Sequence, residues 1–215
     1  MTLYLHGLGA TGDVWRGYAG LCPDLPGHGS MSWDPPYTFE RHAHAVAHLL
    51  TSPAPVVGHS MGGVVGLALA AMHPELVTAV VGIGIKVAWS DDDVARAQAL
   101  AAKSPVVFAS REEAVDRFLK VSGLAGLLDE PLERAVVEVD GGWRLAQDPA
   151  TFGVGVPDMA GLVAAARCPV VLARGEHDAM VSHEELAELV PSPVTLPGLG
   201  HNAHVEKPEA VLALL

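Results

Sequence analysis

A serine flanked by glycines lies in the first third of the chain. Residues 58–62 are Gly-His-Ser-Met-Gly, placed between the apolar run Pro55–Val57 and a helix of small residues. A serine at such a strand-to-helix turn takes a strained backbone conformation, and its Oγ projects above the sheet. The turn also opens a helix, where backbone N–H groups favour developing negative charge. This pattern predicts that Ser60 is a nucleophile; the alternative is a serine that only caps the helix.

A second glycine-flanked loop, His6-Gly7-Leu8-Gly9, follows the first apolar run of the chain. Its backbone can turn an N–H group toward a negatively charged oxygen near Ser60. Together with the turn at the serine, this loop predicts an oxyanion hole formed by the N–H groups of Leu8 and Met61. The side chain of His59 is expected to line the substrate pocket.

A serine nucleophile needs a base, and the base needs an acid that orients it. Asp178 follows the apolar run Pro169–Ala173, and His201 follows the run Val194–Leu196. Both residues therefore come directly after later strands. The sequence predicts a catalytic triad of Ser60, Asp178 and His201, in that chain order.

Neighbouring residues offer alternatives for the base and the acid. His204 lies three residues after His201 and is the other candidate base, while Glu176 lies two residues before Asp178 and is the other candidate acid. Met180 lies just beyond the acid and is expected to line the substrate pocket.

Two groups of residues could suggest a metal. Glu40, His44 and His48 recur at helical spacing, but the local sequence lacks a fourth ligand, so no metal site is expected there. The aspartates Asp91–Asp93 are expected to begin a helix instead of holding a cation. The predicted chemistry requires no cofactor.

Short apolar runs alternate with helical patterns over much of the chain. This alternation is typical of an α/β fold with a mostly parallel sheet and helices on both faces. Ser182 and Glu185 are expected to form a capping box. Six strands are expected, at Thr2–Leu5, Gly20–Cys22, Pro55–Val57, Val77–Ile85, Pro169–Ala173 and Val194–Leu196. Helices are expected at Thr38–Leu50, Met61–His73 and Ser182–Val190.

The alternation breaks between residues 87 and 157. We expect this segment to form a helical cap, or lid, inserted into a core made of residues 1–86 and 158–215. Trp143 is expected to line the pocket under the cap, with packing inside the cap as the alternative. The expected pieces of the cap are helices at Asp91–Ala102, Arg111–Val121 and Pro131–Val137, and a turn at Gly141-Gly142.

Composition limits the class of partner. The 215 residues include 25 acidic side chains against 13 Lys and Arg, and the net charge of −12 opposes binding to nucleic acids and anionic membranes. A small neutral or apolar substrate is expected instead. No apolar run reaches the ~18 residues of a membrane span. With 2 cysteines and an N-terminus that does not resemble a secretory leader, a cytoplasmic location is expected.

Together, these motifs resemble the α/β-hydrolase superfamily, in particular its capped, esterase-like members. The segment Asp24-Leu25-Pro26-Gly27-His28-Gly29 is similar to the family's D-x-P-G-x-G turn, and Gly198–Pro208 resembles the segment that carries the catalytic histidine. The resemblance implies a triad of Ser60, Asp178 and His201 and an oxyanion hole formed by Leu8 and Met61. These are the same residues that the motifs alone predict.

The chain departs from the family pattern in two places. Only Met1–Leu5 precedes the His-Gly loop, so the sheet is expected to lack the family's first two strands. The first strand would then be exposed at an edge that a loop, or a second copy of the chain in a homodimer, would cover. Met31 occupies the position of a family serine, so the support of the oxyanion loop by this turn is expected to differ.

The expected reaction is hydrolysis of a small to medium, largely apolar carboxylic ester, thioester or lactone through an acyl-enzyme. Carbon–carbon bond hydrolysis, acyl transfer and lyase chemistry are alternatives on the same fold. A different class of protein is a small-molecule receptor that keeps the triad but has little turnover.

Overall fold

The computed structural model describes residues 1–128 and 132–215. Its core is a parallel sheet of six strands in the order β2-β1-β3-β4-β7-β8. All six predicted strands are confirmed, and their ends lie within two residues of the predicted ones. The strands are β1 (Thr2–Leu5), β2 (Gly20–Leu21), β3 (Ala54–His59), β4 (Val77–Ile83), β7 (Val170–Gly175) and β8 (Val194–Leu196).

Both faces of the sheet are buried. Successive residues of a strand point to opposite faces, so the four inner strands β1, β3, β4 and β7 each contribute to two apolar clusters. In β1, Leu3 and Leu5 pack into one cluster and Tyr4 packs into the other. In β3, Val56 and Val57 divide in the same way. The runs of apolar residues in the sequence therefore reflect burial on both sides, which is the usual state of parallel strands.

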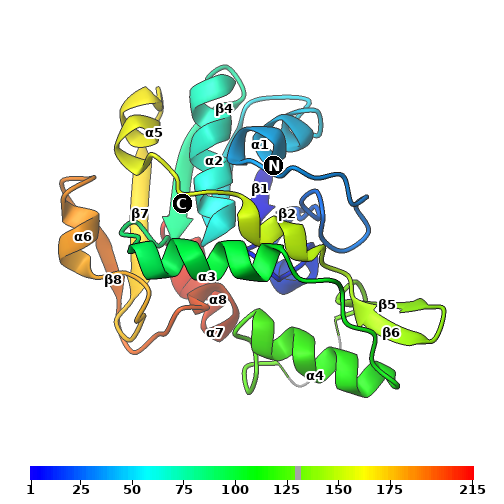
Figure 1. The fold of residues 1–215 in the computed structure, drawn as a ribbon. Helices are drawn as coiled ribbons and strands as arrows, with labels where there is room; N and C mark the ends of the chain where they lie inside the picture. Colours follow the sequence, from blue (N-terminus) through cyan, green and yellow to red (C-terminus); the bar gives the residue numbers. More distant parts are fainter. Residues whose placement is uncertain (129–131) are drawn as a thin grey trace.

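Helices cover the two faces (Figure 1). The three helices predicted for the core are confirmed, although α1 and α6 are shorter than predicted. No helix among the described residues is both long enough and apolar enough to cross a bilayer. One face packs against α1 (Phe39–Ala47), α2 (Met61–Met72), α5 (Met159–Ala165) and α6 (His183–Ala187). The other face packs against the 3-10 turn Gly12–Trp15, α7 (Ala203–Glu206) and α8 (Pro208–Leu212).

The predicted capping box is present at the start of α6. The N–H of Glu185 donates to the Ser182 hydroxyl over 3.1 Å, and the N–H of Ser182 donates to the Glu185 carboxylate over 2.6 Å. These bonds satisfy backbone donors that the first turn of a helix leaves unpaired.

The insertion between residues 87 and 157 contains a hairpin as well as helices. Its helices α3 (Asp91–Ala101) and α4 (Arg111–Val121) match the prediction. Strands β5 (Val136–Val139) and β6 (Gly142–Leu145) pair antiparallel, and a 3-10 turn follows at Pro149–Gly153. In Figure 1, α3 crosses in front of the sheet, and α4 lies below it beside the hairpin.

The predicted helix at Pro131–Val137 is wrong over the part that is described. Pro131 lies outside the described residues, and Val136 and Val137 begin β5. These β-branched side chains favour a strand, and Val136 is buried. The expected turn is confirmed at Gly141, whose φ of 86° lies in the region that favours glycine. The dipeptide Asp140-Gly141 is typical of a hairpin turn.

The edge of the sheet is also different from the one expected. The predicted exposure of the first strand is wrong, because β1 lies between β2 and β3. The chain leaves β1 through the turn at Gly12–Trp15 and returns on the outer side, where Gly20 pairs with Thr2. The edge strand β2 has only 2 residues, so it offers little backbone to another chain.

An arginine of the insertion is bound to the core. The Nε of Arg134 donates to the carboxylate of Asp13 over 2.7 Å, and its guanidinium lies 3.1 Å from the carboxylate of Asp24. The segment before β5 is thereby fixed next to the loop that follows β1.

Candidate active site

Ser60 lies at the carboxyl end of β3, where the chain enters α2. Its φ of 50° and ψ of −119° make it the one non-glycine residue with a positive φ among those described. The turn is tight because its glycines leave no room for a side chain. A Cβ on Gly58 would overlap the carbonyl group of Gly62, and a Cβ on Gly62 would overlap the carbonyl oxygen of Leu5. The strained turn predicted from the glycine spacing is therefore present.

His201 and Asp178 are in contact. The Nδ1 of His201 lies 3.0 Å from a carboxylate oxygen of Asp178, which is buried. The other carboxylate oxygen accepts the N–H of Met180 over 2.8 Å. Arg174 donates to the backbone carbonyls of Asp178 and Val181 over 2.9 and 2.7 Å. The acid is thus held by its own loop and by an arginine that the sequence analysis missed.

The alternative acid and base lie elsewhere. The carboxylate of Glu176 accepts the N–H of Gly198 over 2.7 Å. His204 is 1% exposed, neither of its ring nitrogens has a hydrogen-bond partner in the described part of the chain, and burial lowers its pKa to about 3. In the structure it is Asp178, not Glu176, that contacts His201.

Ser60 and His201 line a cavity of about 310 Å³ between the core and the insertion. Leu8 and Met61, predicted to form the oxyanion hole, line it as well. Its core side is completed by the predicted pocket residues, His59 and Met180, together with apolar side chains such as Val64 and Ile85. The insertion contributes residues that the sequence analysis did not assign to the site, among them Trp89, Lys120, Val121, Ser122 and Phe152.

Trp143 has a different place from the one expected. It is absent from the described lining of this cavity. The backbone N–H of Trp143 donates to the backbone carbonyl oxygen of Phe108 over 2.9 Å, and the backbone N–H of Phe108 donates to the carbonyl oxygen of Trp143 over 2.6 Å. The guanidinium of Arg111 lies 5.9 Å from the Trp143 ring centre. Trp143 therefore packs inside the insertion, the alternative considered for it, whereas Phe152, in the 3-10 turn that follows the hairpin, lines the cavity.

Two buried histidines support the loop that carries Leu8. The Nε2 of His28 accepts the N–H of Gly9 over 3.3 Å, and the Nε2 of His6 accepts the N–H of Leu25 over 2.9 Å. Burial lowers the pKa of His6 to about 4 and the pKa of His28 well below its usual value. Both imidazoles are therefore neutral near pH 7, as they must be in order to accept these bonds.

Asp24 ties the same loop to the D-x-P-G-x-G turn. It accepts the N–H of Gly12 over 2.8 Å and the N–H and hydroxyl of Ser30 over 2.9 Å each. Burial by itself would raise the pKa of Asp24, but the bonds from Ser30 and Gly12 lower it. Ser30, next to Met31, therefore supplies a hydroxyl to this turn, a role that the sequence analysis did not assign to it.

Of the histidines considered as metal ligands, His44 lies on α1 and His48 directly follows it, and neither is among the described lining of this cavity. The Nε2 atoms of His44 and His48 are 3.4 Å apart. Among the described residues, no group of three or more His, Cys, Asp or Glu side chains is arranged to hold a metal ion.

Comparison of the sequence and the structure with those of known proteins identifies the family of this chain. The chain is 28% identical to esterase Rv0045c of Mycobacterium tuberculosis, with 99% of this chain and 80% of the esterase covered. It is 38% identical to lipase LipV of the same organism over 90 residues, which is 37% of this chain and only 34% of that lipase. The crystal structure of E-2-(acetamidomethylene)succinate hydrolase has a TM-score of 0.81 at 23% identity, with 100% of this chain and 89% of that chain covered. The profile of the Alpha/beta hydrolase family matches residues 3–214, and the chain therefore belongs to the α/β-hydrolase family.

Proposed function

We propose that the protein is a serine hydrolase that cleaves a carboxylic ester, or a thioester or lactone, through an acyl-enzyme intermediate. The observation that carries this proposal is the contact of 3.0 Å between His201 and Asp178 beside a cavity that opens onto the strained Ser60. The relatives named esterase and lipase support ester hydrolysis as the reaction.

In the proposed first step, the Oγ of Ser60 attacks the carbonyl carbon of the ester while the Nε2 of His201 takes the hydroxyl proton. The resulting imidazolium donates its Nδ1–H to Asp178, which holds the ring in the required tautomer. The N–H groups of Leu8 and Met61 bind the oxygen that becomes negative. The intermediate then expels the alcohol, which receives the proton from His201, and Ser60 remains acylated.

In the second step, His201 removes a proton from water, and the hydroxide attacks the acyl carbon. The acid leaves, and the proton returns to the Oγ of Ser60. No further group is needed for the chemistry.

The substrate is proposed to carry a small or medium apolar part next to the ester. The cavity beside Ser60 is lined mainly by apolar side chains, including Val64, Ile85 and Val154, and has a volume of about 310 Å³. An apolar pocket distinguishes substrates by about 1–3 kcal/mol per methylene, so the activity should vary gradually with acyl length.

The test is hydrolysis of p-nitrophenyl esters together with labelling by a fluorophosphonate. Sustained turnover and labelling are expected for the wild type, and Ser60→Ala should lose the label and lower kcat by about 10⁴-fold or more. A single burst without turnover would favour a receptor. Labelling that persists in Ser60→Ala would contradict the assignment of the nucleophile.

A further inference from the structure

A second cavity lies beside the catalytic one. Its volume is about 100 Å³, and it is formed by the segment after α3, by α4, by β6 and by the turn at Pro149–Gly153. Val121 and Phe152 line both cavities, so the two spaces adjoin at these side chains. Phe108, Val106 and Leu145 give the second cavity an apolar lining.

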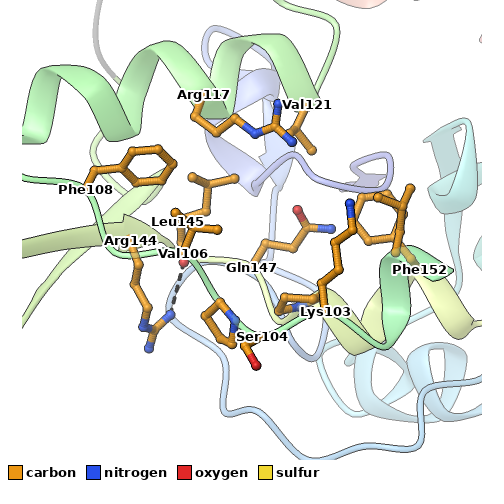
Figure 2. Close-up of a pocket in the computed structure, with 13 residues that line it drawn as sticks. Lys103, Ser104, Val106, Phe108, Arg117, Val121, Arg144, Leu145, Gln147 and Phe152 are labelled. Atoms are coloured by element: carbon orange, nitrogen blue, oxygen red, sulfur yellow. Dashed lines mark hydrogen bonds between the residues drawn. The ribbon is translucent and has the colours of Figure 1, made fainter. Parts of the chain in front are cut away.

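Cations from two elements face this space. Figure 2 shows the side chains of Arg117 and Lys103 extending toward it from opposite sides, and Gln147 also lines it. The ion pairs found within residues 1–128 and 132–215 include neither Arg117 nor Lys103. Both side chains are at the solvent-exposed rim, so an anion could reach them without displacing an acidic partner.

A third cation, Arg144, is already engaged. Its guanidinium lies 3.8 Å from the centre of the Trp33 ring and donates to the carbonyl of Leu145 over 3.0 Å. It adds positive charge at the edge of the cavity but is not aimed into the space, as Figure 2 also shows. Arg117 and Lys103 are therefore the cations available to a ligand.

The acidic residues that the structure describes lie outside the lining of both cavities. No Asp or Glu is among the described residues that line either one. Asp148, which lies close enough to influence Arg144, accepts the hydroxyl of Tyr37 over 2.8 Å and the N–H of Ala150 over 2.9 Å. In a chain with a net charge of −12, this local excess of cations is opposite in sign to the average surface.

We propose that this second cavity is a subsite for an anionic group, a carboxylate or a phosphate, at the far end of the ester substrate. The proposal rests on the proposed hydrolase function and specifies its substrate class. The reacting carbonyl lies at Ser60, an apolar stem passes Val121 and Phe152, and the anion lies between Arg117 and Lys103. A guanidinium binds either anion through paired N–H groups, and the ammonium adds a point charge.

The test compares p-nitrophenyl esters of matched chain length that end in a methyl group, a carboxylate or a phosphate, over a series of increasing lengths. At the best length, kcat/KM for an anion-ended ester should exceed that of the methyl-ended ester, and this preference should fall with added salt because the cations are exposed. The double variant Lys103→Gln/Arg117→Gln should reduce the preference about tenfold, a loss typical of charged hydrogen bonds, and leave the methyl-ended ester unaffected. Whichever of the two anions gives the larger preference identifies the group.

The matched control is Arg96→Gln, which removes an exposed cation of α3 that lines neither cavity. It should keep the wild-type preference. Wild-type hydrolysis of the methyl-ended ester with no preference for either anion at any length would overturn the subsite, as would a preference that survives in the double variant. Failure to hydrolyse any of the esters would instead contradict the proposed hydrolase function. In that case the subsite can still be tested by calorimetry, which measures the binding of a dicarboxylate or a phosphate of the same chain length to the Ser60→Ala variant.

Discussion

The Nε2 of His59 lies 3.0 Å from the backbone carbonyl oxygen of His201. A carbonyl only accepts, so the imidazole donates this bond, and burial keeps His59 neutral by holding its pKa well below the usual value. The residue before the proposed nucleophile thus fixes the backbone of the proposed base. His59 is buried, which makes it a positioning residue more than a surface for substrate.

We therefore expect His59→Phe to lower kcat about tenfold or more on activated esters, because the ring is kept but the bond that positions His201 is lost. KM and the melting temperature should change little. The matched control is His204→Phe: its ring packs 4.3 Å from that of His59, centre to centre, but has no hydrogen-bond partner in the described structure. Equal losses in both variants would show that ring packing, not the hydrogen bond, is responsible.

Phe152 and Trp143 give a second matched pair. Phe152 lines the catalytic cavity, and Trp143 pairs with Phe108 inside the insertion through backbone hydrogen bonds. Phe152→Ala should shift the ratio of kcat/KM values between short and medium acyl esters, because it enlarges the pocket. Trp143→Ala should leave this ratio unchanged and lower the melting temperature. The opposite pattern would return Trp143 to the pocket.

The buried histidines should make the fold sensitive to acid. Burial lowers the pKa of His6 and His42 to about 4 and that of His204 to about 3, below the 6.5 of an unfolded imidazole. The unfolded chain therefore binds more protons between about pH 6.5 and 4, so the free energy of unfolding falls as the pH falls through this window. Each histidine contributes a slope of about 1.4 kcal/mol per pH unit there.

His42 allows this slope to be tested. Its ring stacks on Tyr37 at 5.9 Å, and neither ring nitrogen has a hydrogen-bond partner in the described residues. Phe can replace it without losing a bond, so His42→Phe should remove about one proton from the pH dependence of urea unfolding. His48→Gln, at the exposed residue that follows α1, is the control and should keep the full slope. An unchanged slope in His42→Phe would count against burial as its origin.

The sheet and the triad region could be predicted because their signals are local. Parallel strands are short apolar runs, and the turn at Ser60 needs glycines at fixed positions, so the pattern around β3 indicated both strand and turn. The contact between His201 and Asp178 followed from a topological rule, since both residues come directly after neighbouring strands.

The insertion was harder to predict because its packing depends on distant partners. Nothing near Trp143 in the sequence shows that it pairs with Phe108, or that Phe152 lines the cavity. The prediction of a helix that includes Val136 is wrong, although Asp140-Gly141 is a hairpin signal.

The burial of α4 limits how a substrate can reach Ser60. Ala114 and Phe118 of α4 are 0% and 1% exposed and belong to the same apolar cluster as Trp15 of the core. If the insertion moved away from the core as one rigid body, these side chains would become exposed to water. Exposure of Phe118 alone would cost about 1.5–3 kcal/mol of free energy. Entry that requires only movement of side chains lining the cavity, such as those of Val121 and Phe152, avoids this penalty. The rate of substrate binding should then depend on local motion of side chains and not on separation of the insertion from the core.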